Sequence, residues 1–165
     1  MLEELASTFP ILTCILFLPV IGAVVLWLFD DEDMVRTSAL TIALLELALC
    51  VFVLLRFTPE SAAMQLSEHV PWIPALGISY HLAVDGISVL FVGLTAFLTV
   101  LIVIYSWDTV RHQVKLYMMA LLALETTTMG VFLSIDLIRF FVFWELMLIP
   151  SYFLIILWGA GAERH

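Results

Sequence analysis

The stretch IRFFVFWELMLIPSYFLIILW, residues 138–158, is an apolar run long enough to cross a membrane, and it contains one carboxylate, Glu145, and one proline, Pro150. A carboxylate near the middle of a bilayer costs roughly 2.5–3.5 kcal/mol, so it usually faces the protein interior or a water-filled cavity. Pro150 has no N–H to donate to the carbonyl of Leu146, which predicts a helix break in the form of a kink just after the glutamate, with a backbone polar group left open there. The stretch therefore predicts a transmembrane helix with a functional acid beside a break.

Apolar residues dominate the rest of the chain as well. Of its 165 residues 64% are hydrophobic and only 13% are charged, with a mean hydropathy of +1.15. This composition excludes an ordinary soluble domain and predicts an all-α, polytopic transmembrane bundle that forms a single domain over residues 1–165. Five runs are predicted to be transmembrane helices: 11–29, 38–55, 87–105, 116–133 and 138–158.

Charge and cysteine usage exclude several classes of function. The net charge is −9 with only six Lys and Arg, so the chain has no basic patch for nucleic acid. Cys14 and Cys50 lie in separate apolar runs without metal-ligand spacing and are predicted to be buried thiols. Because the sequence has neither an Fe–S cysteine set nor a nucleotide-binding glycine fingerprint, we expect no metal, no cofactor and no redox chemistry in this chain.

Two further acids lie inside predicted helices and join Glu145 as candidates for a proton path. Glu46 shares a helical face with the small residues Ala39, Ala43 and Cys50, which predicts that it points into the bundle. It can act as a lateral relay group, or it can be a neutral, hydrogen-bonded carboxyl. Glu125 precedes three threonines, whose hydroxyls can bond it or the helical carbonyls, and both a functional and a structural role stay open for it.

The polar segment 56–85 separates the second and third predicted helices and is predicted to be an interfacial loop or a short strand pair. Its His69 and His81 are interpreted as surface or structural histidines, because no third metal ligand is nearby in the sequence. Asp85 is predicted to cap the helix that follows it.

The short turn at residues 134–136 predicts that the last two helices are antiparallel neighbours. Asp136 and Arg139 flank the start of the last helix, where they are placed to form a local ion pair at the interface.

Two long patterned runs, YHLAVDGISVLFVGLT and GVFLSIDLIRFFVFWELMLIPSYFLIILWG, resemble the antiporter-like subunits of respiratory complex I, most closely the subunit 4 (NuoM) type. The resemblance implies the front portion of a fold with roughly fourteen helices and two inverted repeats. It also implies that Glu145 pairs with a lysine on a later, broken helix. Because no predicted helix here contains lysine, that residue must lie beyond His165 or in another chain. The resemblance assigns no role to Glu125 or Arg139.

The predicted function is that of the N-terminal part of a proton-translocating membrane subunit of an NADH:quinone oxidoreductase, with Glu145 on the proton path. The expected location is a bacterial inner membrane or another energy-transducing membrane. The expected partners are lipid and other membrane subunits, including a chain or segment that carries the remaining helices. The alternatives are a subunit of a cation/proton antiporter or inorganic-carbon uptake complex, and a non-catalytic membrane scaffold. A truncated chain and a naturally split one both remain open.

Overall fold

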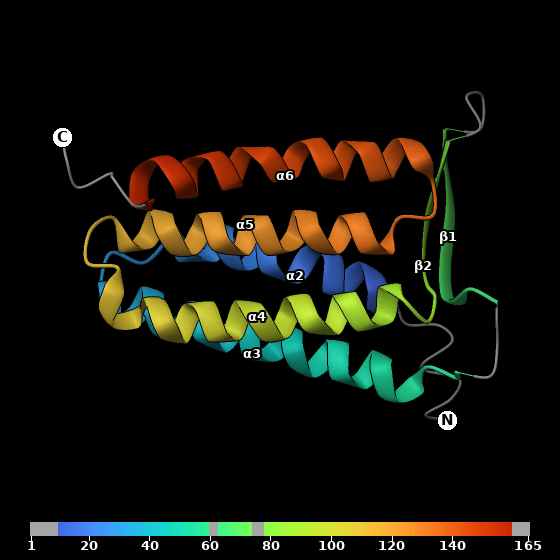
Figure 1. The fold of residues 1–165 in the computed structure, drawn as a ribbon, viewed down its shortest axis with the longest axis horizontal. Coiled ribbons are helices and arrows are strands. Elements are labelled where there is room, and N and C mark those ends of the chain that lie inside the picture. Colours follow the sequence, from blue (N-terminus) through green and yellow to red (C-terminus); the bar gives the residue numbers. More distant parts are fainter. Residues whose placement is uncertain (1–9, 60–62, 74–77, 160–165) are drawn as a thin grey trace.

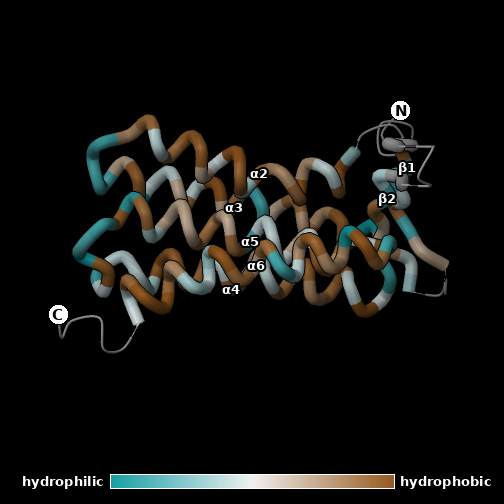
Figure 2. The backbone as a smooth tube through the Cα atoms, turned by 90° about the horizontal axis from the view of Figure 1, so that it is seen from above, coloured by the Kyte–Doolittle hydropathy of each residue, from teal (hydrophilic) through white to brown (hydrophobic). Residues whose placement is uncertain are grey.

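The computed structural model describes residues 10–59, 63–73 and 78–159, which form a helical bundle with a two-stranded sheet across one end (Figure 1). This confirms the predicted all-α membrane bundle. The elements are α2 (Ile11–Leu26), α3 (Glu32–Arg56), β1 (Gln65–Ile73), β2 (Ile78–Val84), α4 (Ser88–Thr109), α5 (Val114–Leu133) and α6 (Leu137–Trp158). Apolar residues run along the helices and hydrophilic ones gather at the turns (Figure 2).

Four of the described helices, α3 to α6, are long and apolar enough to cross a membrane. The helix α2 is shorter, with 16 residues, and ends at Leu26 instead of continuing to residue 29 as predicted. The N–H groups of Trp27, Leu28 and Phe29 each bond a carbonyl three residues back, so the chain leaves α2 through a tight turn. At about 1.5 Å per residue, α2 is roughly 24 Å long, less than the hydrocarbon thickness of about 30 Å.

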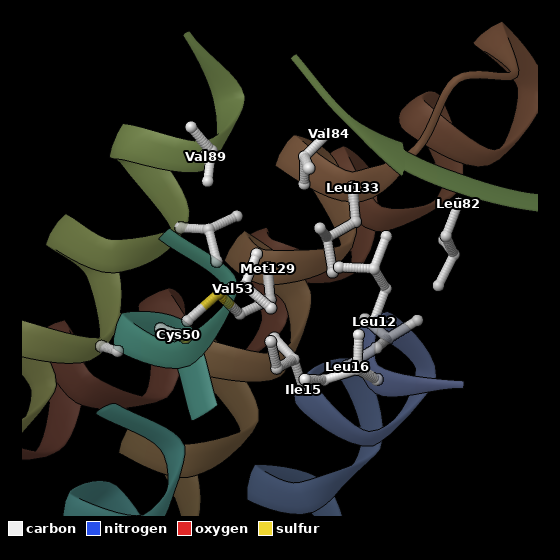
Figure 3. Packing of buried hydrophobic residues seen from close by; sticks show 13 residues of the cluster. Leu12, Ile15, Leu16, Cys50, Val53, Leu82, Val84, Val89, Met129 and Leu133 are labelled. Atoms are coloured by element: carbon white, nitrogen blue, oxygen red, sulfur yellow. The ribbon is translucent and has the colours of Figure 1, made fainter. Parts of the chain in front are cut away.

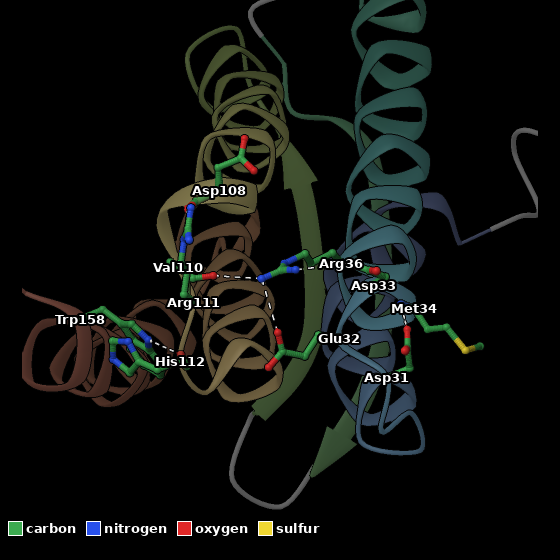
Figure 4. Close-up of polar contacts among 10 residues, drawn as sticks. All are labelled: Asp31, Glu32, Asp33, Met34, Arg36, Asp108, Val110, Arg111, His112 and Trp158. Carbon is green, nitrogen blue, oxygen red and sulfur yellow. Dashed lines mark hydrogen bonds and ion pairs between the residues drawn. The ribbon is translucent and has the colours of Figure 1, made fainter.

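The helix α3 begins at Glu32, six residues before the predicted start at 38, because polar residues build its first turn. The Asp31 side chain accepts a hydrogen bond from the Met34 N–H at 2.8 Å and caps the helix. Arg36 lies 3.6 Å from Glu32 and donates to the Val110 carbonyl at 3.1 Å, which ties this end of α3 to the end of α4 (Figure 4). Two of the four consecutive acids at residues 30–33, Glu32 and Asp33, thus lie in the first turn of α3.

The helix α5 lies at the centre of the bundle and packs against α2, α3, α4 and α6. Its buried side chains join those of α2, α3, α4 and β2 in a hydrophobic cluster near the sheet (Figure 3). By contrast, α6 packs mainly on α5. In the most apolar 18-residue segment of each helix, 6% of the residues are buried in α6, against 44% in α5. The prediction that the last two helices are antiparallel neighbours is confirmed, and α6 is the helix that the described bundle leaves most uncovered.

The strands β1 and β2 pair antiparallel, with His69 opposite His81, so the strand-pair alternative for this segment is confirmed. The two imidazole rings meet edge to face at 5.0 Å. Burial, followed by the charge of His69, lowers the pKa of His81. The register is irregular near Gln65 and near Pro71, where a proline is tolerated because the ladder is interrupted. A single bridge between Leu82 and Ser134 attaches β2 to the turn between α5 and α6.

The predicted capping role of Asp85 at the start of α4 is confirmed. Its Oδ1 accepts hydrogen bonds from the Ser88 N–H at 2.6 Å and the Ile87 N–H at 3.0 Å, and its own N–H donates to the Ser88 hydroxyl at 2.9 Å. The bond from the Ser88 backbone is the main reason why the pKa of the Asp85 carboxyl is lowered.

Replacing Asp85 with alanine is expected to destabilise the fold by about 1 kcal/mol, the usual loss for an N-cap. Because the folded pKa is below the ordinary value of about 3.9, the contribution is fully present above that value and disappears as the pH falls through the folded pKa. Thermal unfolding in detergent, at neutral pH and in acid, measures it. Asp85→Asn keeps an accepting oxygen and is the control. An unchanged melting temperature for Asp85→Ala at neutral pH would contradict the cap.

Candidate functional site

The three predicted proton-path acids occupy two different environments. Glu46 on α3 and Glu125 on α5 are buried, with 0% and 2% of their surface exposed, and these two helices pack together so that the two acids interact electrostatically. Glu145 on α6 is exposed on the surface of the bundle. The structure therefore brings two of the acids together and sets the third apart.

Glu46 lies on the predicted small-residue face. Ala39, Ala43 and Cys50 are buried beside it, which confirms that this face points into the bundle. The Cys50 thiol is the hydrogen-bond partner of Glu46, through a long contact of 3.9 Å to Oε1, while Oε2 is buried without a hydrogen-bond partner in the described part of the chain. The carboxyl is thus surrounded by small and apolar groups.

Glu125 has even fewer polar contacts, since neither of its oxygens has a hydrogen-bond partner among the described residues. The hydroxyls of Thr126, Thr127 and Thr128 do not bond it but donate back to helical carbonyls, for example Thr126 to Leu122 at 3.1 Å. Thr99 on α4 is buried and interacts with Glu125, although its hydroxyl donates to the Thr95 carbonyl at 3.1 Å. Of the two roles predicted for the threonine hydroxyls, bonding Glu125 or bonding helical carbonyls, the structure shows the second.

Glu145 lies in α6, which is one uninterrupted helix. Pro150 lies inside α6, which runs without a gap from Leu137 to Trp158, so the proline does not end the helix, and the kink expected there stays a prediction. The Ser151 hydroxyl donates to the Met147 carbonyl at 2.7 Å, which supplies one hydrogen bond in the turn that contains the proline. Pro150 is the buried residue of α6, whereas Glu145 is exposed on the helix surface.

A groove of about 670 Å³ runs between α2, α6 and the strand pair. Its walls are mostly apolar, and its charged residues, Asp136 and Arg139, lie at the start of α6. Leu146, the neighbour of Glu145 in sequence, also lines it. Asp136 caps α6 by accepting from the Ile138 N–H at 2.7 Å, and the Arg139 guanidinium lies over the Tyr80 ring at 5.2 Å.

Sequence reasoning missed a polar network that joins the strand pair to α2. The Glu68 carboxylate on β1 accepts hydrogen bonds from the N–H groups of Leu12 at 2.6 Å and Thr13 at 3.0 Å, and from the Thr13 hydroxyl at 2.5 Å. The Tyr80 hydroxyl bonds that of Thr13 at 2.9 Å, and burial raises the Tyr80 pKa. One signal was present in the sequence: Pro10, at the N-cap of α2, has no side-chain acceptor, so the cap must come from elsewhere.

Replacing Glu68 with alanine is expected to lower the stability of the contact between the strand pair and α2 by about 2 kcal/mol, because hydrogen bonds to a charged group contribute roughly 1.5–3 kcal/mol. Limited proteolysis of segment 56–85 and thermal unfolding both report the loss. Glu68→Gln keeps one accepting oxygen and should lose less. Equal cleavage rates in Glu68→Ala and the unchanged chain would contradict the role of Glu68 as a cap for α2.

No protein-family model matches the chain, but individual relatives do. It is 41% identical over 160 residues to NAD(P)H-quinone oxidoreductase chain 4 2 of Thermosynechococcus vestitus, covering 95% of this chain and 30% of that protein. It is 35% identical over 162 residues to NADH-quinone oxidoreductase subunit M of Rickettsia conorii, covering 94% and 33%. It is 30% identical over 156 residues to F(420)H(2) dehydrogenase subunit M of Methanosarcina mazei, covering 94% and 32%.

Among solved structures, the fold is similar to a chain of the membrane-bound sulfane sulfur reductase, an archaeal respiratory membrane complex. The TM-score is 0.65 at 23% identity, covering 86% of this chain and 22% of that one. The chain therefore spans about a third of the length of the curated relatives it matches, in their N-terminal part. These findings confirm the resemblance to antiporter-like subunits of the subunit 4 type, which was inferred from the two patterned runs of sequence.

Proposed function

We propose that this chain, which matches the N-terminal part of antiporter-like subunits of the subunit 4 type, serves in a proton-translocating complex of the NADH:quinone oxidoreductase class. Glu145 is its proton-path carboxylate. The complex lies in a bacterial inner membrane or another energy-transducing membrane. Electron transfer belongs to partner subunits, and the chain moves protons without redox chemistry of its own.

The observation that carries this proposal is the position of Glu145 on the most uncovered helix. An acid exposed at membrane depth is costly, so it should face protein or a water-filled cavity in the assembled state. The curated relatives are about three times as long as the matched region. Further helices of such a protein, in the same polypeptide or in another, would cover α6 and bring polar partners to Glu145.

The proposed mechanism is a change in the charge of Glu145 when a basic group on a covering helix moves or is neutralised. Moving one elementary charge against 100 mV takes about 2.3 kcal/mol. Making or losing a hydrogen bond to a charged group is worth roughly 1.5–3 kcal/mol, which is of the required size. Glu46 and Glu125 extend this path toward the interior of the described bundle.

Gentle detergent extraction from the native membrane, followed by mass spectrometry of the intact chain and its copurifying proteins, tests the proposal. Copurifying Fe–S and flavin subunits, together with ion translocation that depends on an electron donor, are the expected results. Copurification with only antiporter or carbon-uptake subunits, and translocation without an electron donor, would contradict the electron-coupled function.

A further inference from the structure

The buried acids Glu46 and Glu125 occupy one shared environment between α3 and α5. Three of their four carboxyl oxygens are buried without a hydrogen-bond partner in the described residues, and the fourth has only the distant Cys50 thiol. An unsatisfied buried polar group costs about 1–3 kcal/mol, so a fold that keeps three such atoms together needs an explanation. A ligand shared between the two acids supplies one.

Charge identifies that ligand. Glu46 interacts electrostatically with Glu125, Cys50 and Cys14, and none of these three groups is a cation. The basic residues of the adjoining helices, Arg36, Arg56 and Lys115, belong to the end turns of α3 and α5. Two ionised carboxylates would repel each other in this apolar core without compensation. The fully ionised pair is therefore excluded without a positive charge. Because the described residues hold no group of three or more His, Cys, Asp and Glu that could bind a metal ion, a proton fits this pair better than a metal ion.

We propose that Glu46 and Glu125 form a single proton-binding unit that exchanges one proton. In its loaded state both acids are protonated. In its unloaded state one proton has left, and a single negative charge remains at the contact between α3 and α5. The loss of a proton from one acid therefore opposes its loss from the other. A role of this pair in proton transport rests on the proposed function. Its ability to bind a proton does not.

The unit is separate from Glu145. It lies among α3, α4 and α5, whereas Glu145 is exposed on α6, beyond α5. The two sites can therefore be perturbed independently. Titration of one acid of a coupled pair depends on the presence of the other, and this dependence is the property to measure.

Infrared spectroscopy of the full chain in lipid nanodiscs, as a function of pH, tests the unit. At a pH where exposed carboxyl groups have already lost their protons, the infrared absorption of protonated carboxyl groups comes from buried acids. Glu46→Gln is expected to move the ionisation of Glu125 by more than about one pH unit, and Glu125→Gln that of Glu46 by a similar amount. Glu145→Gln, the same chemical change outside the unit, should leave both unchanged. Shifts below that size in both inner variants would overturn the proposal.

The glutamine variants are nearly isosteric, and Glu46→Leu and Glu125→Leu provide a second pair if a glutamine variant does not fold. They remove the acid without adding a polar group to the core, and the same shift of the remaining acid is expected. The two proposals fail separately. Independent titration of Glu46 and Glu125 removes the coupled unit and leaves the role of Glu145 intact. Unchanged proton translocation in Glu145→Gln removes the proposed function and leaves the coupled unit intact.

Discussion

Glu145→Gln is expected to reduce proton translocation by the assembled complex at least about tenfold while the chain still folds and assembles. Glutamine has nearly the same shape but cannot ionise, so the charged interaction of Glu145 is lost. A loss of about 1.5–3 kcal/mol corresponds to tenfold or more. Folding of the described bundle should hardly change, because Glu145 lies on its surface, where substitutions usually stay within about 0.5 kcal/mol.

Membrane vesicles that contain the complex provide the measurement, with electron-donor oxidation and the transmembrane pH difference recorded together. Glu32→Gln is a matched control, since Glu32 is also an exposed glutamate, and its contact with Arg36, at 3.6 Å, is a surface ion pair worth little. The control should translocate normally. If Glu145→Gln moved as many protons per electron as the unchanged protein, Glu145 would not be on the path.

The order and type of the helices could be predicted from the sequence because membrane-length apolar runs dominate it. Their ends could not, because local polar chemistry decides them. The acidic residues 30–33 look like a solvated connector by composition, yet Asp31 caps α3, and Glu32 and Asp33 lie in its first turn. Pro150 was expected to kink its helix, and because a proline removes only one hydrogen bond from a long helix, α6 continues through it to Trp158.

The orientation of an acid within its own helix could be predicted better than its place in the bundle. Helical spacing alone placed Glu46 on a face with Ala39 and Cys50 that is buried in the structure. The exposure of Glu145 depends instead on which helices cover α6, and one chain of 165 residues does not contain that information. The bonds from Glu68 to Leu12 and Thr13 join residues 56 and 55 positions apart, beyond any local pattern.

Gly130→Ala is expected to destabilise the contact between α5 and α6 by about 1–3 kcal/mol, the usual cost of overpacking. A methyl group at Gly130 would collide with ring atoms of Phe143 close to the α6 backbone, so the ring or the whole helix must shift. Because Phe143 precedes Glu145 by two residues, this shift also moves the functional acid. Thermal unfolding in detergent measures the stability, and the vesicle assay used for Glu145 measures the functional consequence.

Gly93→Ala on α4 is the matched control for Gly130→Ala, since a methyl group there meets nothing within 4 Å. Alanine loses less conformational entropy than glycine when a helix forms. This variant should therefore be as stable as the unchanged chain, or up to about 1 kcal/mol more stable. Phe143→Leu should recover part of the loss in Gly130→Ala, because contacting residues give non-additive effects. Equal melting temperatures for the two alanine variants, or strict additivity with Phe143→Leu, would show that the Gly130–Phe143 contact does not hold α6 in place.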